Sequence, residues 1–308
     1  MTLFALILAL LLEQLRPLKQ RSAVDDWLCR WSTRAVEMYD DHSFANGRVA
    51  WLLLIGGGSG AVWLIHSLLD ALHPLLAFVF SAAVLYLLLG FRRDEVMFTD
   101  IQRALADDDV DAAAQRLHDW DGGKHAGAPV GQLARVTVEH ALLRAHRGIY
   151  GVLFWFVILP GPVGVVMYRL ARQFGHACAA RPDAAESAFG GFAERAWEVL
   201  DAVPARLTAV AFAVIGHFED AVLCWRTQAV LWPERSAGIV LAAGGGALGL
   251  RLGMPLRSGD TVIDRPELGL GAAADVDQMP RVARMIWRVL VVYVLVVALL
   301  TIAGWVGQ

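Results

Sequence analysis

Charge is scarce in this chain, and there is no surplus of basic residues. Only 19% of the 308 residues are charged, and the formal net charge is −3. Proteins that bind nucleic acid use clustered Lys and Arg, often with aromatic side chains on which bases stack, and the sequence has no such pattern. We therefore exclude nucleic acid as a partner.

Cysteine is scarce as well. Cys29, Cys178 and Cys224 are odd in number and widely separated. They form neither a disulfide framework nor a C-x-x-C metal motif, so we expect buried, unreactive thiols. The sequence predicts no metal site and no cofactor.

Apolar residues, by contrast, make up 57% of the chain, more than in an ordinary soluble domain. Several apolar runs are long enough to cross a bilayer. The sequence therefore predicts an all-α fold, a polytopic membrane helical bundle with broken or re-entrant central elements and amphipathic cytoplasmic helices. The lipid bilayer is the first partner that we expect.

The N-terminal apolar run, residues 2–12, is followed by Arg16, Lys19 and Arg21. A secretory signal has its positive charges before the apolar core, so this order predicts a retained membrane anchor. Its basic flank belongs on the cytoplasmic side. We expect a multi-pass protein of the bacterial inner (cytoplasmic) membrane.

Polarity divides the chain into five predicted segments. Residues 1–92 form N-terminal membrane helices with an amphipathic linker, and 93–148 form a cytoplasmic helical segment. Residues 149–250 contain the central broken membrane elements. A polar loop at 251–284 precedes a C-terminal transmembrane helix at 285–308.

The central apolar stretch, residues 149–172, is interrupted by Pro160-Gly161-Pro162. Proline breaks a helix, so the stretch predicts two half-helices. Arginines flank both ends, and the positive-inside rule then gives no reason to place the ends on opposite faces. This favours a re-entrant hairpin, with a proline-kinked span as the alternative.

His217 and Glu219 lie near the end of a helix predicted over residues 203–225. Residues two positions apart in an α-helix point about 200° from each other, so these two side chains cannot both face one groove. His217 falls on the apolar stripe and is expected to face the bundle interior. Glu219 is expected nearer the interface.

Short motifs occur in an order that resembles a known family. They are Leu153-Phe154-Trp155, Pro204-Ala205-Arg206-Leu207, the glycine-rich residues 237–250, Arg265-Pro266-Glu267-Leu268-Gly269 and a closing apolar span. The order resembles the cobalamin-biosynthesis membrane proteins called CobD or CbiB. It also resembles their relative AmpE, an inner-membrane protein associated with control of β-lactamase induction. For CobD/CbiB, the resemblance implies a synthase that joins a corrinoid carboxylate to aminopropanol phosphate.

The chain departs from that synthase pattern at three polar clusters, where the family carries Glu-Asn-x-x-Asp-Gly, then Asn and Asp, then Ser-Pro-Asn. The residues found here are Leu143-Arg144 with Arg147-Gly148, Arg172 with Gly175, and Glu234-Arg235-Ser236. Activating a carboxylate requires positioned acids, amides or a metal. The replacements therefore indicate that catalysis has been lost.

Other stretches resemble AmpE, namely residues 1–4, residues 199–204 and Ile215-Gly216-His217-x-Glu219. We expect an AmpE-like, non-catalytic protein on a CobD/CbiB-type scaffold. It would bind an anionic ligand or a partner in regulation of the cell-envelope or β-lactamase response. The alternative is a divergent adenosylcobinamide-phosphate synthase, an enzyme of cobalamin biosynthesis that forms an amide bond with aminopropanol phosphate.

The expected ligand site is rich in arginine, which suits a phosphate, an anionic headgroup or a carboxylated cell-wall fragment. Its candidate residues are Glu139, Arg144, Arg147, Arg169, Arg172, Arg206, His217 and Glu219. Ordinary cytoplasmic-side topology with lipid-headgroup contacts explains the same arginines equally well. Besides lipid and this anionic small molecule, we expect a membrane or cytoplasmic regulatory partner. A homo-oligomer is compatible with the sequence.

Overall fold

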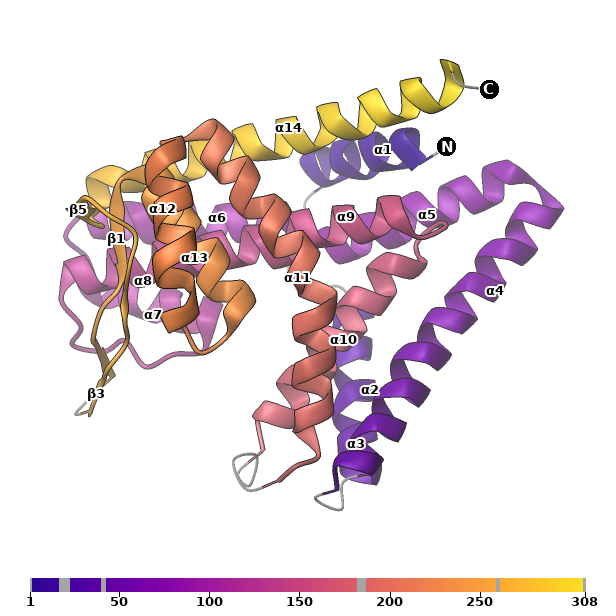
Figure 1. Ribbon diagram of the computed structural model, residues 1–308, viewed down its shortest axis with the longest axis horizontal. Coiled ribbons are helices and arrows are strands. Elements are labelled where there is room, and N and C mark those ends of the chain that lie inside the picture. The colour runs from indigo at the N-terminus through magenta and orange to yellow at the C-terminus, as the bar shows by residue number, and fades with distance from the viewer. Residues whose placement is uncertain (1, 17–22, 40–42, 182–186, 259–260, 307–308) are drawn as a thin grey trace. The chain divides into compact units, whose positions relative to one another are not determined.

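The computed structural model describes residues 2–16, 23–39, 43–181, 187–258 and 261–306 (Figure 1). Lys19 and Arg21 of the predicted basic flank lie outside the described residues. Helices dominate the described chain, and four of them are long and apolar enough to cross a membrane. The predicted all-α, polytopic membrane fold is confirmed.

The first half of the chain is helical almost throughout. Its elements are α1 (Thr2–Leu15), α2 (Ala23–Tyr39), α3 (Phe44–Trp51), the π-helical turn η1 (Leu52–Gly56), α4 (Gly57–Leu72), α5 (Pro74–Leu89), α6 (Phe91–Ala106), α7 (Val110–Asp121), α8 (Val130–Ala145) and the π-helical turn η2 (His146–Tyr150).

The second half adds a small amount of β-structure to the helices. Its elements are α9 (Gly151–Ile158), α10 (Val163–Ala179), α11 (Gly190–Ile215), α12 (Phe218–Gln228), η3 (Ala229–Leu231), α13 (Arg235–Leu248), β1 (Leu250–Gly253), β2 (Leu256–Ser258), β3 (Thr261–Ile263), β4 (Glu267–Leu268), β5 (Ala272–Ala273), η4 (Val276–Gln278) and α14 (Met279–Val306).

The chain forms two compact units. Unit 1 comprises Met1–Gly90, Gly151–Ala202 and Val297–Gln308, and unit 2 comprises Phe91–Tyr150 and Val203–Val296. The five-segment division remains a prediction. The chain is helical without interruption over Val130–Ile158, so the boundary predicted at residue 148 falls within a helix.

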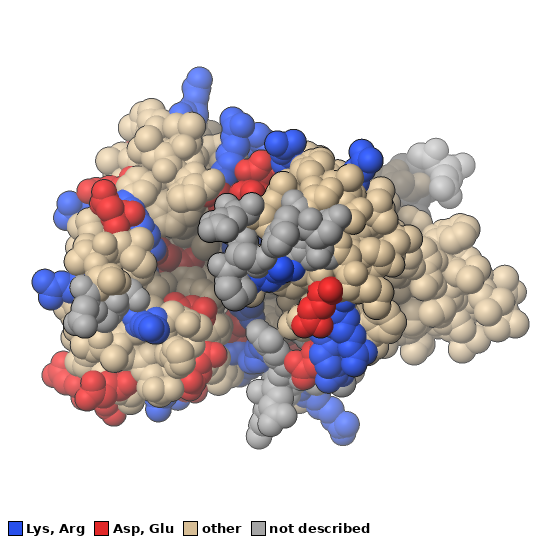
Figure 2. Space-filling model, turned by 90° about the horizontal axis from the view of Figure 1, so that it is seen from below, with Lys and Arg blue, Asp and Glu red and all other residues tan. Residues whose placement is uncertain are grey.

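The candidate spans differ in how much of their apolar surface the protein covers. In Phe44–Leu72 only 6% of the apolar window is buried, whereas in Val130–Ile158 the share is 67%. The first span therefore leaves most of its surface to lipid, and the second lies largely inside protein. On the face drawn in Figure 2, charged side chains gather over part of the surface, and a wide area shows none.

In unit 1, α9 and α10 form a hairpin whose turn contains Gly161 in a left-handed conformation (φ 60°). The arms approach so closely that a Cβ added to Gly151 would lie 2.3 Å from the Tyr168 hydroxyl. A Cβ on Gly164 would lie 2.1 Å from the Trp155 carbonyl oxygen. The predicted break into two half-helices at Pro-Gly-Pro is observed, and the two arms contact each other closely. Their re-entrant placement in the membrane stays a prediction.

In unit 2, the glycine-rich helix α13 packs against α12. A Cβ on Gly246 would lie 2.5 Å from the Asp220 carbonyl oxygen, so only glycine permits this approach. Strand β1 follows α13 and lies between β4, which is antiparallel to it, and β5, which is parallel. Strands β2 and β3 form a hairpin. The predicted polar loop thus contains short strands, which lie next to α8 and α13.

Candidate functional site

Helix α8 and the turn η2 of unit 2 carry most of the buried charge. Arg135, Glu139, Arg144 and Arg147 follow one another at intervals of three to five residues. Arg135 and Arg265 both approach Glu139, Arg144 pairs with Asp94, and Arg147 pairs with Glu234. Unit 2 therefore holds three neighbouring polar clusters, which we describe from η2 outward.

The first cluster lies at η2. Arg147 is 8% exposed and forms an ion pair with Glu234, the residue before α13. In the same turn, the buried His146 ring places Nδ1 2.9 Å from Thr208 Oγ1, which lies 3.4 Å from the Tyr293 hydroxyl. A π-helical turn is rare and often occurs at a functional site. The turn brings a guanidinium and an imidazole together in a buried setting.

This cluster joins two positions at which the chain departs from the CobD/CbiB pattern. Arg147 stands where the pattern has Asp, and Glu234 stands where it has Ser. In the structure these two replacements form one ion pair. They therefore compensate each other electrostatically, which the sequence alone did not indicate.

The second cluster links α6, α7 and α8. Arg144 binds Asp94 in a bidentate manner, with Nε 3.1 Å from Oδ2 and Nη2 2.8 Å from Oδ1. The Trp120 indole donates to Asp94 at 3.0 Å, and the Trp287 indole donates to Glu95 at 3.1 Å. Arg144 is thus held by a carboxylate from a helix about 50 residues earlier.

A mostly apolar pocket of about 40 Å³ lies beside Asp94, and it has room for a water molecule or a small apolar group. Its larger lining residues are Phe91, Phe98, Trp120, Ile149, Ile286 and Trp287. The two carboxylates at its edge, Asp94 and Glu95, already accept hydrogen bonds, so they are oriented by the protein.

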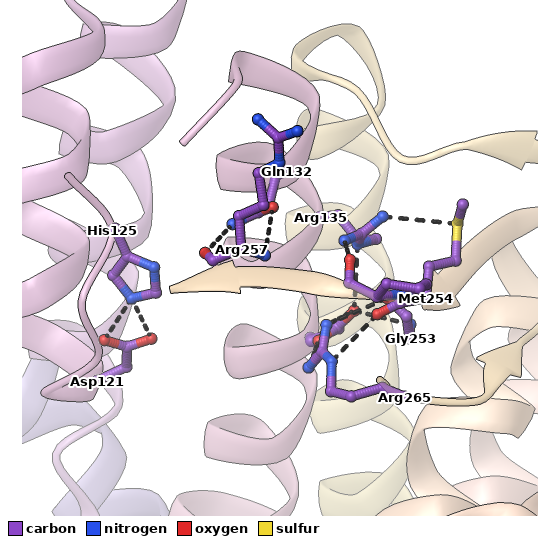
Figure 3. Close-up of polar contacts among 10 residues, drawn as sticks. Asp121, His125, Gln132, Arg135, Gly253, Met254, Arg257 and Arg265 are labelled. Atoms are coloured by element: carbon purple, nitrogen blue, oxygen red, sulfur yellow. Dashed lines mark hydrogen bonds and ion pairs between the residues drawn. The ribbon is translucent and has the colours of Figure 1, made fainter. Parts of the chain in front are cut away.

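The third cluster surrounds Glu139, which is 4% exposed. Arg135, Gly253 and Arg265 of this cluster lie close together in Figure 3. Its carboxylate accepts the Gly253 backbone N–H at 2.8 Å and Arg265 Nη1 at 2.9 Å. Arg135 Nε lies 3.8 Å from the same carboxylate. Glu139 therefore links the end of β1 and the segment that carries Arg265 to α8.

Near the start of α8, the loop after α7 is closed by a histidine and an aspartate (Figure 3). His125 Nε2 lies 2.9 and 2.8 Å from the two Asp121 oxygens. Burial disfavours the ionised carboxylate, but hydrogen bonds from His125 and from the Gly123 N–H outweigh it and lower the pKa of Asp121.

Arg169 and Arg172 belong to unit 1, where both contribute to packing. Arg169 donates to the carbonyl oxygens of Leu88 and Leu89, at the end of α5, with Nη2 3.0 Å from Leu89. Arg172 lies over the Trp197 ring, 5.6 Å from its centroid. Their predicted role in ligand binding stays a prediction.

The prediction for His217 is wrong. Helix α11 ends at Ile215 and α12 begins at Phe218, so His217 lies between two helices and is exposed. The cause is Gly216, which packs against Ala247 so closely that an added Cβ would lie 2.3 Å from its carbonyl oxygen. His217 N–H donates to the same oxygen at 2.9 Å. The helical spacing argument therefore does not apply, and the expected cavity beside His217 fails with it.

Glu219 and Arg206 are also exposed, on α12 and α11. Of the predicted residues in unit 2, only Glu139, Arg144 and Arg147 lie in the buried clusters. The partners that the sequence interpretation missed are Asp94, Trp120, Arg135, Thr208, Glu234 and Arg265. Only Arg135 had a local signal, because it precedes Glu139 by one helical turn.

Comparison with known proteins gives a consistent result. A family model described as "CobD/Cbib protein" matches residues 2–303. The protein named cobalamin biosynthesis protein CobD from Stutzerimonas stutzeri is 33% identical over 261 residues, covering 85% of this chain and 83% of the relative. Its namesake from Chromobacterium violaceum is 34% identical over 247 residues, covering 79% and 75%.

A more distant relative of the same name, from Mycobacterium tuberculosis strain H37Rv, is 29% identical over 257 residues, covering 80% of each chain. No solved structure matches this chain. These relatives overturn the expectation of an AmpE-like, non-catalytic regulator. Three replaced polar motifs do not outweigh similarity that extends over most of the chain.

Proposed function

We propose, because this chain belongs to the CobD/CbiB family, that it acts in cobalamin biosynthesis as a multi-pass membrane synthase. The reaction is the one that the family resemblance implies. A corrinoid carboxylate is first activated by a phosphoryl donor such as a nucleoside triphosphate. The amino group of aminopropanol phosphate then attacks the acyl carbon, so that the new amide C–N bond replaces a C–O bond, and the oxygen leaves with the phosphate. The observation that carries the proposal is the similarity over 85% of the chain to a relative named for cobalamin biosynthesis. We place the protein in the bacterial inner membrane.

We propose the cluster at η2 as the reaction site. Such a site needs a fixed cation for an anionic group and a side chain that can move a proton. Arg147 and His146 are neighbours in one buried turn, and Glu234 holds the Arg147 guanidinium in place. Two segments in which this chain replaces the family's polar motifs meet there, which supports this location.

A complementation assay tests the function. The gene is expressed in a corrinoid-auxotrophic strain that lacks its own synthase, and growth is measured without added cobalamin. We expect growth with the wild-type chain and with Arg103→Ala, because the Arg103 side chain is 73% exposed. We expect none with Arg147→Ala. Absence of growth with wild-type protein that is detected in the membrane fraction would reject the synthase proposal.

A further inference from the structure

The Glu139 cluster contains more positive than negative charge. One buried carboxylate faces two guanidinium groups, from Arg135 and Arg265. Arg265 takes the closer place, with Nη1 2.9 Å from Glu139, whereas the nearest approach of Arg135 is 3.8 Å. The two arginines repel each other across a carboxylate that can neutralise only one of them.

Arg265 is fully supported by its surroundings. Besides its bond to Glu139, it donates to the carbonyl oxygens of Met254 at 3.2 Å and Gly253 at 3.1 Å. Its guanidinium lies 5.5 Å from the centroid of the Trp232 ring. Nothing further is required to stabilise this cation.

Arg135 has weaker hydrogen-bond partners than Arg265. Its Nη2 donates to the Pro255 carbonyl oxygen at 2.9 Å, and its Nη1 donates to the Met254 sulfur at 3.5 Å (Figure 3). A thioether is a weak acceptor. Within the described part of the chain, the buried Nε–H has no hydrogen-bond acceptor. A buried charged donor without an acceptor is costly, so this group favours an additional anion.

The residue that covers Arg135 is itself strained. Met254 has φ 65°, a left-handed conformation that is uncommon for a residue other than glycine. Such strain persists where the surroundings impose it, and often at functional sites. The Met254 side chain is flexible, so its sulfur can leave the guanidinium at small cost.

We propose that Arg135, next to Arg265, binds a phosphate group, whose oxygens take the place of the Met254 sulfur. The planar guanidinium fork matches the spacing of phosphate oxygens. The phosphate is either that of a soluble phosphate monoester or that of an anionic lipid headgroup. The site is separate from the η2 cluster, and its existence does not depend on the synthase proposal.

Phosphate binding to the full chain in nanodiscs of zwitterionic lipid tests this site. Each variant is titrated with sodium phosphate against sodium chloride at equal ionic strength, and the shift in its own unfolding midpoint gives an apparent affinity. We expect phosphate to stabilise the wild type. Arg135→Gln should bind phosphate at least tenfold more weakly, and the matched control Arg103→Gln should bind as the wild type does.

Met254→Ala removes the sulfur without changing any charge, and it should bind phosphate severalfold more tightly than the wild type. Because it retains the ion pairs of the cluster, it also tests the site if Arg135→Gln fails to fold. Wild-type affinity in either Arg135→Gln or Met254→Ala would overturn the proposal.

Nanodiscs that contain phosphatidylglycerol distinguish the two sources of phosphate. If a lipid headgroup fills the site, the response to free phosphate disappears in these discs, and Arg135→Gln restores no response. If the ligand is a soluble monoester, the response persists. Neither measurement uses synthase activity, so failure of complementation and failure of phosphate binding are separate results.

Discussion

Four arginines of the predicted ligand site, two in each unit, have different kinds of partner. In unit 1, Arg169 donates to backbone carbonyl oxygens and Arg172 lies over an aromatic ring. In unit 2, Arg144 and Arg147 bind the carboxylates of Asp94 and Glu234. Neutral partners fix a helix end or a ring, whereas carboxylate partners tie distant segments together through charge. Arginines that look equivalent in sequence should therefore differ in how much their substitution lowers the free energy of unfolding.

The largest effect is expected from Glu139→Ala in unit 2. It leaves Arg265 and Arg135 buried without their carboxylate, so the free energy of unfolding should fall by about 3–5 kcal/mol. Chemical unfolding in detergent measures the change. The double variant Glu139→Leu with Arg265→Met removes both charges of the closer pair and should recover part of the loss. A decrease below about 1 kcal/mol for Glu139→Ala would contradict the importance of this carboxylate.

A charge exchange at η2 should give the next largest effect. Arg147→Glu and Glu234→Arg each place like charges together, and each should lower the free energy of unfolding by about 2–4 kcal/mol. The double exchange restores opposite charges and should regain more than half of that loss. A double-mutant cycle measures the coupling energy. Additive losses would show that the two side chains act independently.

In unit 1, the next effect is expected from close packing between the two arms of the hairpin. Gly151→Ala places a Cβ against the buried Tyr168 hydroxyl, which donates to Asp201 at 2.6 Å. We expect a loss of about 1–3 kcal/mol in the free energy of unfolding. The control is Gly60→Ala in α4, where an added Cβ meets nothing within 4 Å. Equal effects of the two substitutions would argue against tight packing of the arms.

The smallest effect is expected at Asp121. Because its folded-state pKa is lowered, the ionised form stabilises the fold above the ordinary value of 3.8, and this contribution disappears as the pH falls through the lower folded-state pKa. Asp121→Asn should cost about 1 kcal/mol near neutral pH. The difference from wild type should vanish in acid. Unfolding curves between pH 6 and pH 3 check both statements.

Local signals were sufficient to predict the break into two half-helices, which is encoded in Pro160-Gly161-Pro162 itself. They failed for His217, because the helix ends where Gly216 meets Ala247, about 30 residues later in the chain. They also failed for most of the buried clusters. Arg147 finds Glu234 and Glu139 finds Arg265 only after the chain has folded, and a single sequence gives no spacing rule for such contacts.

For the candidate function, local motifs were misleading, whereas similarity over most of the chain was informative. Three altered motifs led to the regulator interpretation, although the Arg147–Glu234 contact shows that two of the alterations balance each other. Each replacement changes the residue type at one position, and the two opposite charges compensate each other as a pair. The identity over most of the chain to proteins named CobD was the better guide.

The π-helical turn η2 follows α8 and holds one more residue than an α-helical turn would. Deleting Gly148 should therefore return η2 to α-helical geometry and leave the face of α8 that carries Glu139 in place. A single-residue deletion within α8 has no such turn to absorb it, so it should rotate the side chains on one side of the deletion by about 100° relative to the other side. Deletion scanning should accordingly find η2 more tolerant of the loss of one residue than α8.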